Sequence, residues 1–160
     1  MDKLKEKVLK AQHEGDIASL YVLEQQAHEL FDEETLIAYY ANILELALEN
    51  LTDALEAPRK MNIEEVQDYA TLRALYEYAI EHYSAGKPED AAALFEVLGG
   101  LTTDTTFMSS MSMHQKAIKA KLSLDDFIEK IADVDQTQSK GTFYISAFNK
   151  SAQKLLEKVK

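Results

Sequence analysis

The chain contains no cysteine, and its 160 residues include only five glycines and two prolines. Without cysteine it has neither disulfides nor a thiolate that could bind a metal or act as a nucleophile. The scarcity of glycine and proline favours long helices over many short strands. No stretch approaches the roughly 20 apolar residues of a membrane span, and the N-terminal MDKLKEKVLK lacks the apolar run of a secretory signal. We therefore expect a cytoplasmic protein.

The chain is strongly acidic, with a formal net charge of −11 at pH 7. Binding to nucleic acids or to anionic membranes needs a cationic footprint, so neither is expected of this chain. Acidic residues outnumber basic ones in residues 1–70, whereas the reverse holds in residues 114–160. The basic C-terminal part would suit an acidic partner, although scattered lysines on a helix are more commonly a solvated face.

Apolar residues recur at helical spacing along most of the chain, which predicts an all-α fold of about eight helices. Even the best strand candidate, Phe143–Tyr144–Ile145, lies where the spacing is helical. Side chains that accept hydrogen bonds from free amides should begin several helices, namely Asp16, Asp32, Asn62 with Glu65, and Ser123 with Asp126. The helices are predicted over residues 2–13, 17–30, 33–57, 62–86, 88–98, 107–122, 124–131 and 142–159, with a loop at 135–141.

We expect one domain over residues 1–160, because the length is typical of a single core. Within it, residues 1–70 form N-terminal helices, and residues 71–160 form tetratricopeptide-like repeats followed by a C-terminal capping helix. The predicted helix 33–57 has the widest apolar stripe and should be buried on more than one side. One hairpin cannot cover that much apolar surface, so the N-terminal helices are a candidate homodimer interface.

The most specific stretch is LYEYAIEHYSAGKPEDAAALFEVL, residues 75–98. It predicts two amphipathic helices that fold back on each other across Gly86 and Pro88. Glycine suits the left-handed residue that follows a helix, and proline suits the first turn of the next one. Ala79 and Ala91 would let the two helices approach closely, while neighbouring aromatic residues fill the space beside them. This alternation of small and large residues is typical of a tetratricopeptide hairpin.

The repeat pattern weakens after this hairpin. A shift by the roughly 34 residues of a tetratricopeptide repeat places residues 107–120 over the first helix of a second, degenerate unit. A third unit would begin near Phe143 and has no partner helix. We therefore expect an irregular tetratricopeptide-like superhelix, with the last helix capping the stack.

One pattern resembles the first repeat of the class II chaperones of bacterial type III secretion: Leu75-Tyr76-x-x-Ala79-x-x-x-Tyr83-x-x-Gly86-Lys87-x-Glu89-Asp90-Ala91-x-x-x-Phe95-x-x-Leu98. Those chaperones are small, acidic, all-helical cytoplasmic proteins that hold hydrophobic translocator subunits before export. The resemblance implies a bacterial, non-enzymatic chaperone that takes an extended segment of a secreted protein into a groove and dimerises through its N-terminal helices.

The chain also departs from that family. Its clear repeat begins near residue 71, later than the family arrangement, and its second repeat lacks the usual glycine and alanine markers. A full third repeat is missing. These departures imply a shorter groove, and they leave a needle-subunit or effector cargo open beside a translocator.

By repeat position, the first helix of each unit would line the groove. Tyrosine there would supply a large contact area and a hydroxyl for an extended backbone. Alternatively, Tyr76 and Tyr83 simply pack the hairpin, whose core is expected to include Ala91 and Phe95. The predicted partner-binding residues are Arg73, Tyr76, Ile80, Tyr83, Phe107, Ser110, His114 and Ala117.

Other candidate sites are weaker. Met108, Met111 and Met113 offer either a pliable surface for apolar cargo or filler for a degenerate core. Glu24, His28 and Asp32 follow at four-residue spacing, yet the paired Glu-x-x-His motifs of a di-iron bundle do not occur. The sequence also lacks a phosphate loop, a dinucleotide-binding glycine pattern, a nucleophile elbow and a zinc motif. It predicts no metal, no cofactor and no catalytic residue.

The leading hypothesis is a cytoplasmic chaperone that keeps a secreted translocator, needle or effector protein soluble. The alternative is a helical-repeat adaptor, regulator or immunity-type protein that binds a folded cytoplasmic partner. A helical-bundle enzyme or metal protein is the third hypothesis. A chaperone should bind a short linear fragment of its partner, whereas an adaptor should require the folded partner.

Overall fold

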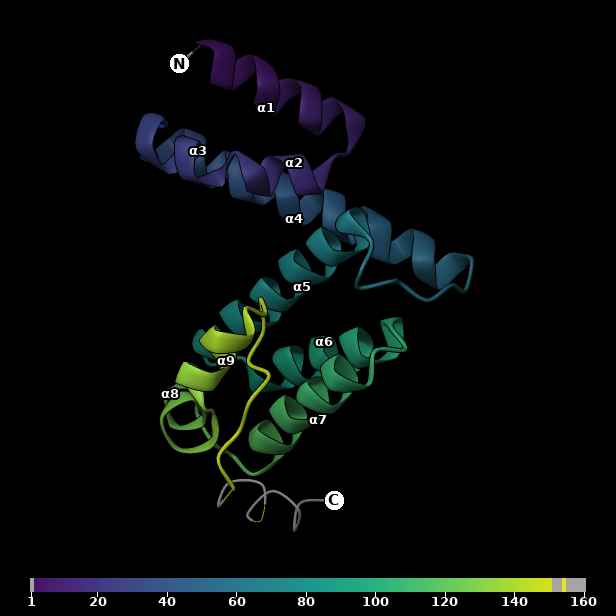
Figure 1. The fold of residues 1–160 in the computed structure, drawn as a ribbon, viewed down its shortest axis with the longest axis vertical. Helices are drawn as coiled ribbons and strands as arrows, with labels where there is room; N and C mark the ends of the chain where they lie inside the picture. The colour runs from purple at the N-terminus through teal and green to yellow at the C-terminus, as the bar shows by residue number, and fades with distance from the viewer. Residues whose placement is uncertain (1, 151–153, 155–160) are drawn as a thin grey trace. The chain divides into compact units, whose positions relative to one another are not determined.

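A computed structural model describes residues 2–150 and 154, and in them the chain is all-α, as the sequence predicts. Contacts divide the chain into two compact units, residues 1–75 and 76–160, which we describe separately. The first unit contains α1 (Asp2–Glu14), α2 (Ile17–Val22), α3 (Glu24–Leu30) and α4 (Glu33–Glu56), and the boundary falls within α5 (Val66–Ser84). The second unit continues with α6 (Pro88–Leu101), α7 (Thr105–Lys119), α8 (Leu124–Asp126), the π-helical turn η1 (Phe127–Ile131) and α9 (Val134–Lys140) (Figure 1).

Two of the predicted capping residues of the first unit act as predicted. The side chain of Asp16 accepts the Ser19 N–H at 3.0 Å and begins α2, and that of Asp32 accepts the Thr35 N–H at 2.7 Å and begins α4. The single helix predicted over residues 17–30 is wrong, because the chain divides it at Leu23 into α2 and α3.

Helix α2 packs against both α1 and α4 and forms the centre of the first unit (Figure 1). Its Ile17 and Leu20 are fully buried, and the hydroxyl of Tyr39 on α4 donates a hydrogen bond to the Leu20 carbonyl. The opposite face of α4 differs from the prediction that its stripe is buried on more than one side. Ile37 is 64% exposed and Leu55 is 59% exposed.

The predicted hairpin opens the second unit. Gly86 adopts the left-handed conformation with φ +77°, and Pro88 is the first residue of α6. The Lys87 N–H donates to the His82 carbonyl at 2.9 Å, which closes the end of α5 in the manner of a Schellman motif. Ala79 and Ala91 are fully buried, as expected where two helices approach closely.

The C-terminal part of the described chain differs from the prediction. The predicted loop at 135–141 is wrong, because residues 135–140 belong to α9. Asp133 caps the start of this helix by accepting the Gln136 N–H at 3.0 Å, and Gly141 ends it with φ +70°. Residues 142–149 are not helical: the chain bends at Phe143 and Tyr144 and then runs extended to an antiparallel bridge between Phe148 and Ala132. The rest of the predicted last helix, apart from Lys150 and Lys154, lies outside the described residues.

Candidate functional site

Residues 142–149, which we call the resident segment, bend at Phe143 and Tyr144, then run extended, and lie against the helices of the second unit. In Figure 1 the segment runs from the end of α9 past the second-unit part of α5 and past α7. We call the surface that it contacts the groove, defined by residues Tyr76, Phe107, His114, Phe127, Ile131 and Thr137.

Tyr76 joins the resident segment to α7 through a chain of hydrogen bonds. The Ile145 N–H donates to the Tyr76 hydroxyl oxygen at 3.1 Å, and that hydroxyl lies 2.8 Å from Nε2 of His114. Nδ1 of His114 lies 2.6 Å from the Ser110 carbonyl, which can only accept. The histidine is therefore protonated on Nδ1, and its Nε2 accepts the tyrosine proton.

Burial reinforces this arrangement of protons. His114 is fully buried, and the cost of burying a charge lowers its pKa to about 4. Burial likewise raises the pKa of Tyr76 well above its ordinary value, so both groups are neutral near pH 7. The site offers hydrogen bonds without any net charge, which suits an uncharged peptide backbone.

Aromatic rings hold the two ends of the resident segment. The ring of Phe107 on α7 lies 6.0 Å from that of Phe143 and 5.0 Å from that of Tyr144. At the other end, the ring of Phe148 lies 6.2 Å from that of Phe127. Such edge and tilted contacts contribute about 0.5–1.5 kcal/mol each beyond the area that they bury.

The backbone of the resident segment forms hydrogen bonds with the turn between η1 and α9. The Asp133 N–H donates to the Ala147 carbonyl at 2.8 Å, and the Asn149 N–H donates to the Ile131 carbonyl at 2.9 Å. These two bonds flank an antiparallel bridge between Ala132 and Phe148.

A threonine on α9 forms hydrogen bonds with the middle of the resident segment. Oγ1 of Thr137 accepts the N–H groups of Ser146 and Ala147, at 3.3 and 3.2 Å. The segment is thus bound as a β-strand would be, although its partners are a turn and a side chain rather than another strand.

The structure gathers most of the predicted partner-binding residues in the second unit and buries them. Phe107, Ser110, His114 and Ala117 are at most 2% exposed and form the inner face of α7. Aromatic side chains of the resident segment contact two of these four residues, Phe107 and His114.

The remaining predicted residues lie in other surroundings. Tyr83 is buried, with burial raising its pKa to about 12, and its hydroxyl donates to the Leu122 carbonyl at 2.7 Å. Ile80 is half-buried. Arg73 belongs to the first unit, where it pairs with Glu24 at 3.1 Å and stacks over the ring of Tyr21.

Sequence reasoning missed Thr137 and the resident segment itself. Asp133 followed by Gln136, with Gly141 four residues further on than Thr137, was a local signal for the start and end of α9. No comparable local signal marks Thr137 as an acceptor for residues 146 and 147, since that contact depends on the fold.

The methionines divide between the two roles considered for them. Met111 is fully buried in the core of the second unit, whereas Met108 is 42% exposed and Met113 is half-buried. One of the three therefore fills the core.

The candidate metal ligands of the first unit bind each other through a tyrosine. The Tyr40 hydroxyl donates to Glu24 at 2.6 Å and lies 2.6 Å from Nε2 of His28. Asp32 caps α4 instead of joining them. In the part of the chain that the structure describes, no three acidic, histidine or cysteine side chains are grouped to hold a metal ion.

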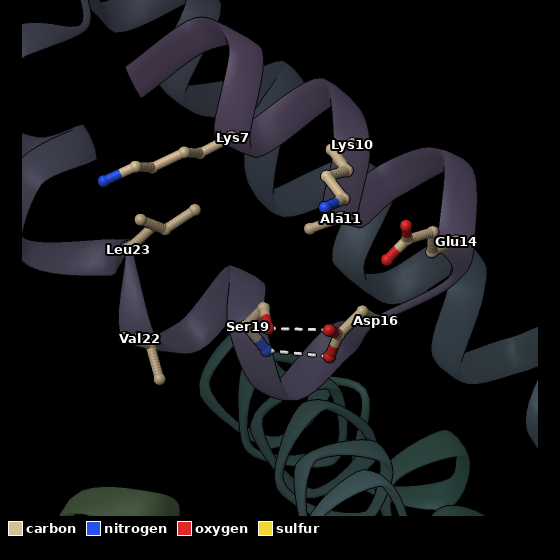
Figure 2. Close-up of a pocket in the computed structure, with 8 residues that line it drawn as sticks. All are labelled: Lys7, Lys10, Ala11, Glu14, Asp16, Ser19, Val22 and Leu23. Carbon is tan, nitrogen blue, oxygen red and sulfur yellow. Dashed lines mark hydrogen bonds between the residues drawn. The ribbon is translucent and has the colours of Figure 1, made fainter. Parts of the chain in front are cut away.

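A separate pocket of about 280 Å³ lies between α1 and α2 (Figure 2). Its rim includes the exposed Lys7, Lys10 and Glu14, and Figure 2 shows Asp16 turned to Ser19. Because Asp16 serves as the cap of α2, no unused buried polar group points into this pocket, and we assign it no function.

Comparisons with models of protein families, with curated proteins and with solved structures found no match to this chain. Among the described residues, no helix is both long enough and apolar enough to cross a membrane.

Proposed function

We propose that the chain is a non-enzymatic cytoplasmic chaperone of a bacterial type III secretion system, which binds an extended segment of a secreted protein and keeps that protein soluble. The observation behind the proposal is the way in which the groove holds residues 142–149. Backbone amides are bonded by Tyr76 and Thr137, and aromatic side chains pack against Phe107 and Phe127. A site of this kind suits an extended peptide.

Two features of the sequence support the same proposal. The net charge of −11 would keep a complex with an apolar cargo soluble by mutual repulsion between particles. The resemblance of residues 75–98 to the first repeat of class II secretion chaperones suggests the cargo, a translocator, needle or effector protein. Sequestering its apolar side chains would prevent aggregation before export.

The exposed face of α4 supports a second interface. Ile37, Leu44 and Leu51 alternate with Leu48 and Leu55 at the spacing of a heptad repeat, and none of them is buried. A seam of this kind associates with another helix through interlocking side chains. We propose that it joins two copies of the chain; the alternative is that it binds a folded partner, as an adaptor or immunity protein would.

Co-expression with secreted proteins encoded near the chain's gene tests the proposal. A tagged chain should retain one of them through purification, and overlapping synthetic fragments of the retained protein should include one that binds alone. Retention of none of these proteins would overturn the chaperone proposal. Binding that requires the folded partner, with no active fragment, would favour the adaptor.

A further inference from the structure

We infer that the resident segment is a built-in competitor: it fills the groove in the free chain, and the cargo's extended segment replaces it. This inference rests on the proposed function and identifies the class of ligand. The ligand would repeat the order of side chains in residues 143–148, with two adjacent aromatic residues, an aliphatic residue, two residues beside a polar cavity and a further aromatic residue.

The bonds that hold the segment do not depend on its sequence. The groove forms hydrogen bonds with the N–H groups of residues 145, 146, 147 and 149 and with the carbonyl of Ala147. Any extended peptide presents such backbone groups. The side chains that contribute most are rings, and rings of another chain would pack in the same positions. Another extended segment could therefore make the same set of contacts.

The resident segment does not fill the space available to it. A cavity of about 480 Å³ lies beside its residues Ser146, Ala147 and Phe148. The opposite walls come from the start of α7 and from α9, with the hydroxyls of Thr105 and Ser109 among them. Side chains alternate along an extended chain, so one of the two residues after the aliphatic residue would face this cavity. A ligand with a larger polar side chain at that position would bury more surface there than the resident segment does.

The connection to α9 permits the exchange. Helix α9 ends at Lys140, and Gly141 follows in the left-handed conformation, so the segment can leave without unwinding α9. Release alone would expose the rings of Phe107 and Tyr76 to water, which opposes opening until another apolar segment covers them. A tethered occupant competes at an effective concentration on the order of millimolar, and the apparent dissociation constant of the ligand rises as the inverse of the open fraction.

A reversible lock tests the inference on the full chain. Ala132 and Phe148 are the bridge pair that carries no mutual hydrogen bonds, and such pairs have Cα atoms about 4.5 Å apart, within the range of a disulfide. Because the chain has no cysteine, Ala132→Cys with Phe148→Cys gives a single disulfide. The probe is a fluorescent peptide of residues 142–149, followed by anisotropy. The two single-cysteine variants and a thermal melt control for damage to the fold.

A second variant opens the groove. Ile145→Pro removes the N–H that donates to Tyr76 and keeps an extended backbone, whereas Ile145→Val keeps the N–H and serves as its control. Loss of one hydrogen bond of ordinary strength raises the open fraction by about fivefold. We expect the peptide to bind Ile145→Pro about fivefold more tightly than wild type, and Ile145→Val within twofold of wild type.

The outcomes separate the inference from the proposed function. Binding that disulfide formation abolishes and reduction restores would support the inference, even if no secreted protein were retained in the co-expression test. Equal binding to the locked and reduced chains, or binding to neither Ile145→Pro nor the reduced chain, would overturn it. Dimers of Ile145→Pro that exchange segments and exclude the peptide would also overturn it, because the ligand would then be a second copy.

Discussion

The hydroxyl of Tyr76 lies 2.8 Å from Nε2 of His114 and receives the Ile145 N–H at 3.1 Å, so one oxygen connects α5, α7 and the resident segment. Each of the three groups is bonded in a fixed direction, because Nδ1 of His114 must donate to the Ser110 carbonyl. The uncharged relay explains how a fully buried histidine can face an extended backbone without a counter-ion.

Replacing Tyr76 by phenylalanine should loosen the resident segment. Tyr76→Phe keeps the ring contacts with Phe143 and Phe95 but leaves the Ile145 N–H and Nε2 of His114 without their partner. Each unsatisfied buried group costs about 1–3 kcal/mol, and two groups lose their partner, so urea unfolding should show a loss of at least that size. Hydrogen exchange at the Ile145 amide should become faster.

Tyr83→Phe is the matched control for this change. It also removes one buried tyrosine hydroxyl, but that hydroxyl donates to the Leu122 carbonyl and not to the resident segment. Stability should fall by a smaller amount, because one group rather than two loses its partner, while exchange at Ile145 stays slow. Faster exchange at Ile145 in both variants would show that it reports general destabilisation rather than the Tyr76 contact.

Stability should depend on pH through His114. The pKa of His114 is about 4 in the folded chain and near 6.5 in the unfolded chain. Above pH 6.5 the histidine is neutral in both states, and the free energy of unfolding has its full value. As the pH falls from 6.5 toward 4, the unfolded chain binds a proton that the folded chain does not, and the free energy of unfolding decreases. A shift of this size corresponds to a loss of about 3 kcal/mol.

Urea unfolding between pH 7.5 and 4.5 measures this loss. His114→Gln keeps a donor and an acceptor but cannot titrate, so the slope over this range should flatten. His82→Gln, on the outer part of α5, controls for the removal of a histidine and should keep the slope. An unchanged slope in His114→Gln would contradict the assignment of the effect to His114.

Thr137 should stabilise the resident segment through its oxygen alone. Thr137→Val conserves the shape of the side chain and removes the acceptor for the Ser146 and Ala147 N–H groups. Exchange at these two amides should rise at least fivefold, with the far-ultraviolet circular dichroism unchanged. Thr103→Val, at an exposed position, should leave both amides slow. If both variants behave alike, the Thr137 oxygen does not hold the segment.

The apolar seam of α4 should set the oligomeric state. Leu48→Glu places a charge in the middle of the seam, where burial of an unpaired carboxylate is costly. Sedimentation should change from dimer to monomer while the helical content is kept. Glu49→Gln, a neighbouring exposed position, is the control and should stay dimeric. A wild-type chain that sediments as a monomer would contradict the proposed interface.

Local sequence signals predicted the turn at Gly86 and the start of α6 at Pro88, but they ended this helix at residue 98, whereas α6 continues through Gly99 and Gly100 to Leu101. They predicted the C-terminal part of the chain poorly, for a physical reason. Gly86 and Pro88 act through their own backbone geometry, so their effect can be read without knowing the fold. In the resident segment, Phe143, Ala147 and Phe148 also have helical spacing, and that pattern outweighed the strand-favouring Phe-Tyr-Ile run. The extended conformation comes from contacts with Tyr76 and Thr137, which no local pattern contains.

The candidate site was predicted in part for a similar reason. Repeat positions identified Tyr76, Phe107 and His114 as neighbours on one face, and the structure brings the three together around the resident segment. The same reasoning included Arg73, whose contacts lie in the first unit. The sequence does not indicate that residues 142–149 cover this face, because their position depends on where α9 ends.

Hydrogen exchange at the Ile145 amide, with and without an added ligand, tests the central claim most directly. The chain is labelled with ¹⁵N and the unlabelled peptide of residues 142–149 is added in excess. We expect slow exchange in the free chain, where Tyr76 accepts this N–H, and fast exchange once the peptide has displaced the segment. An amide that exchanges fast in the free chain, or slowly under saturating peptide, would contradict the claim that the segment fills a groove meant for another chain.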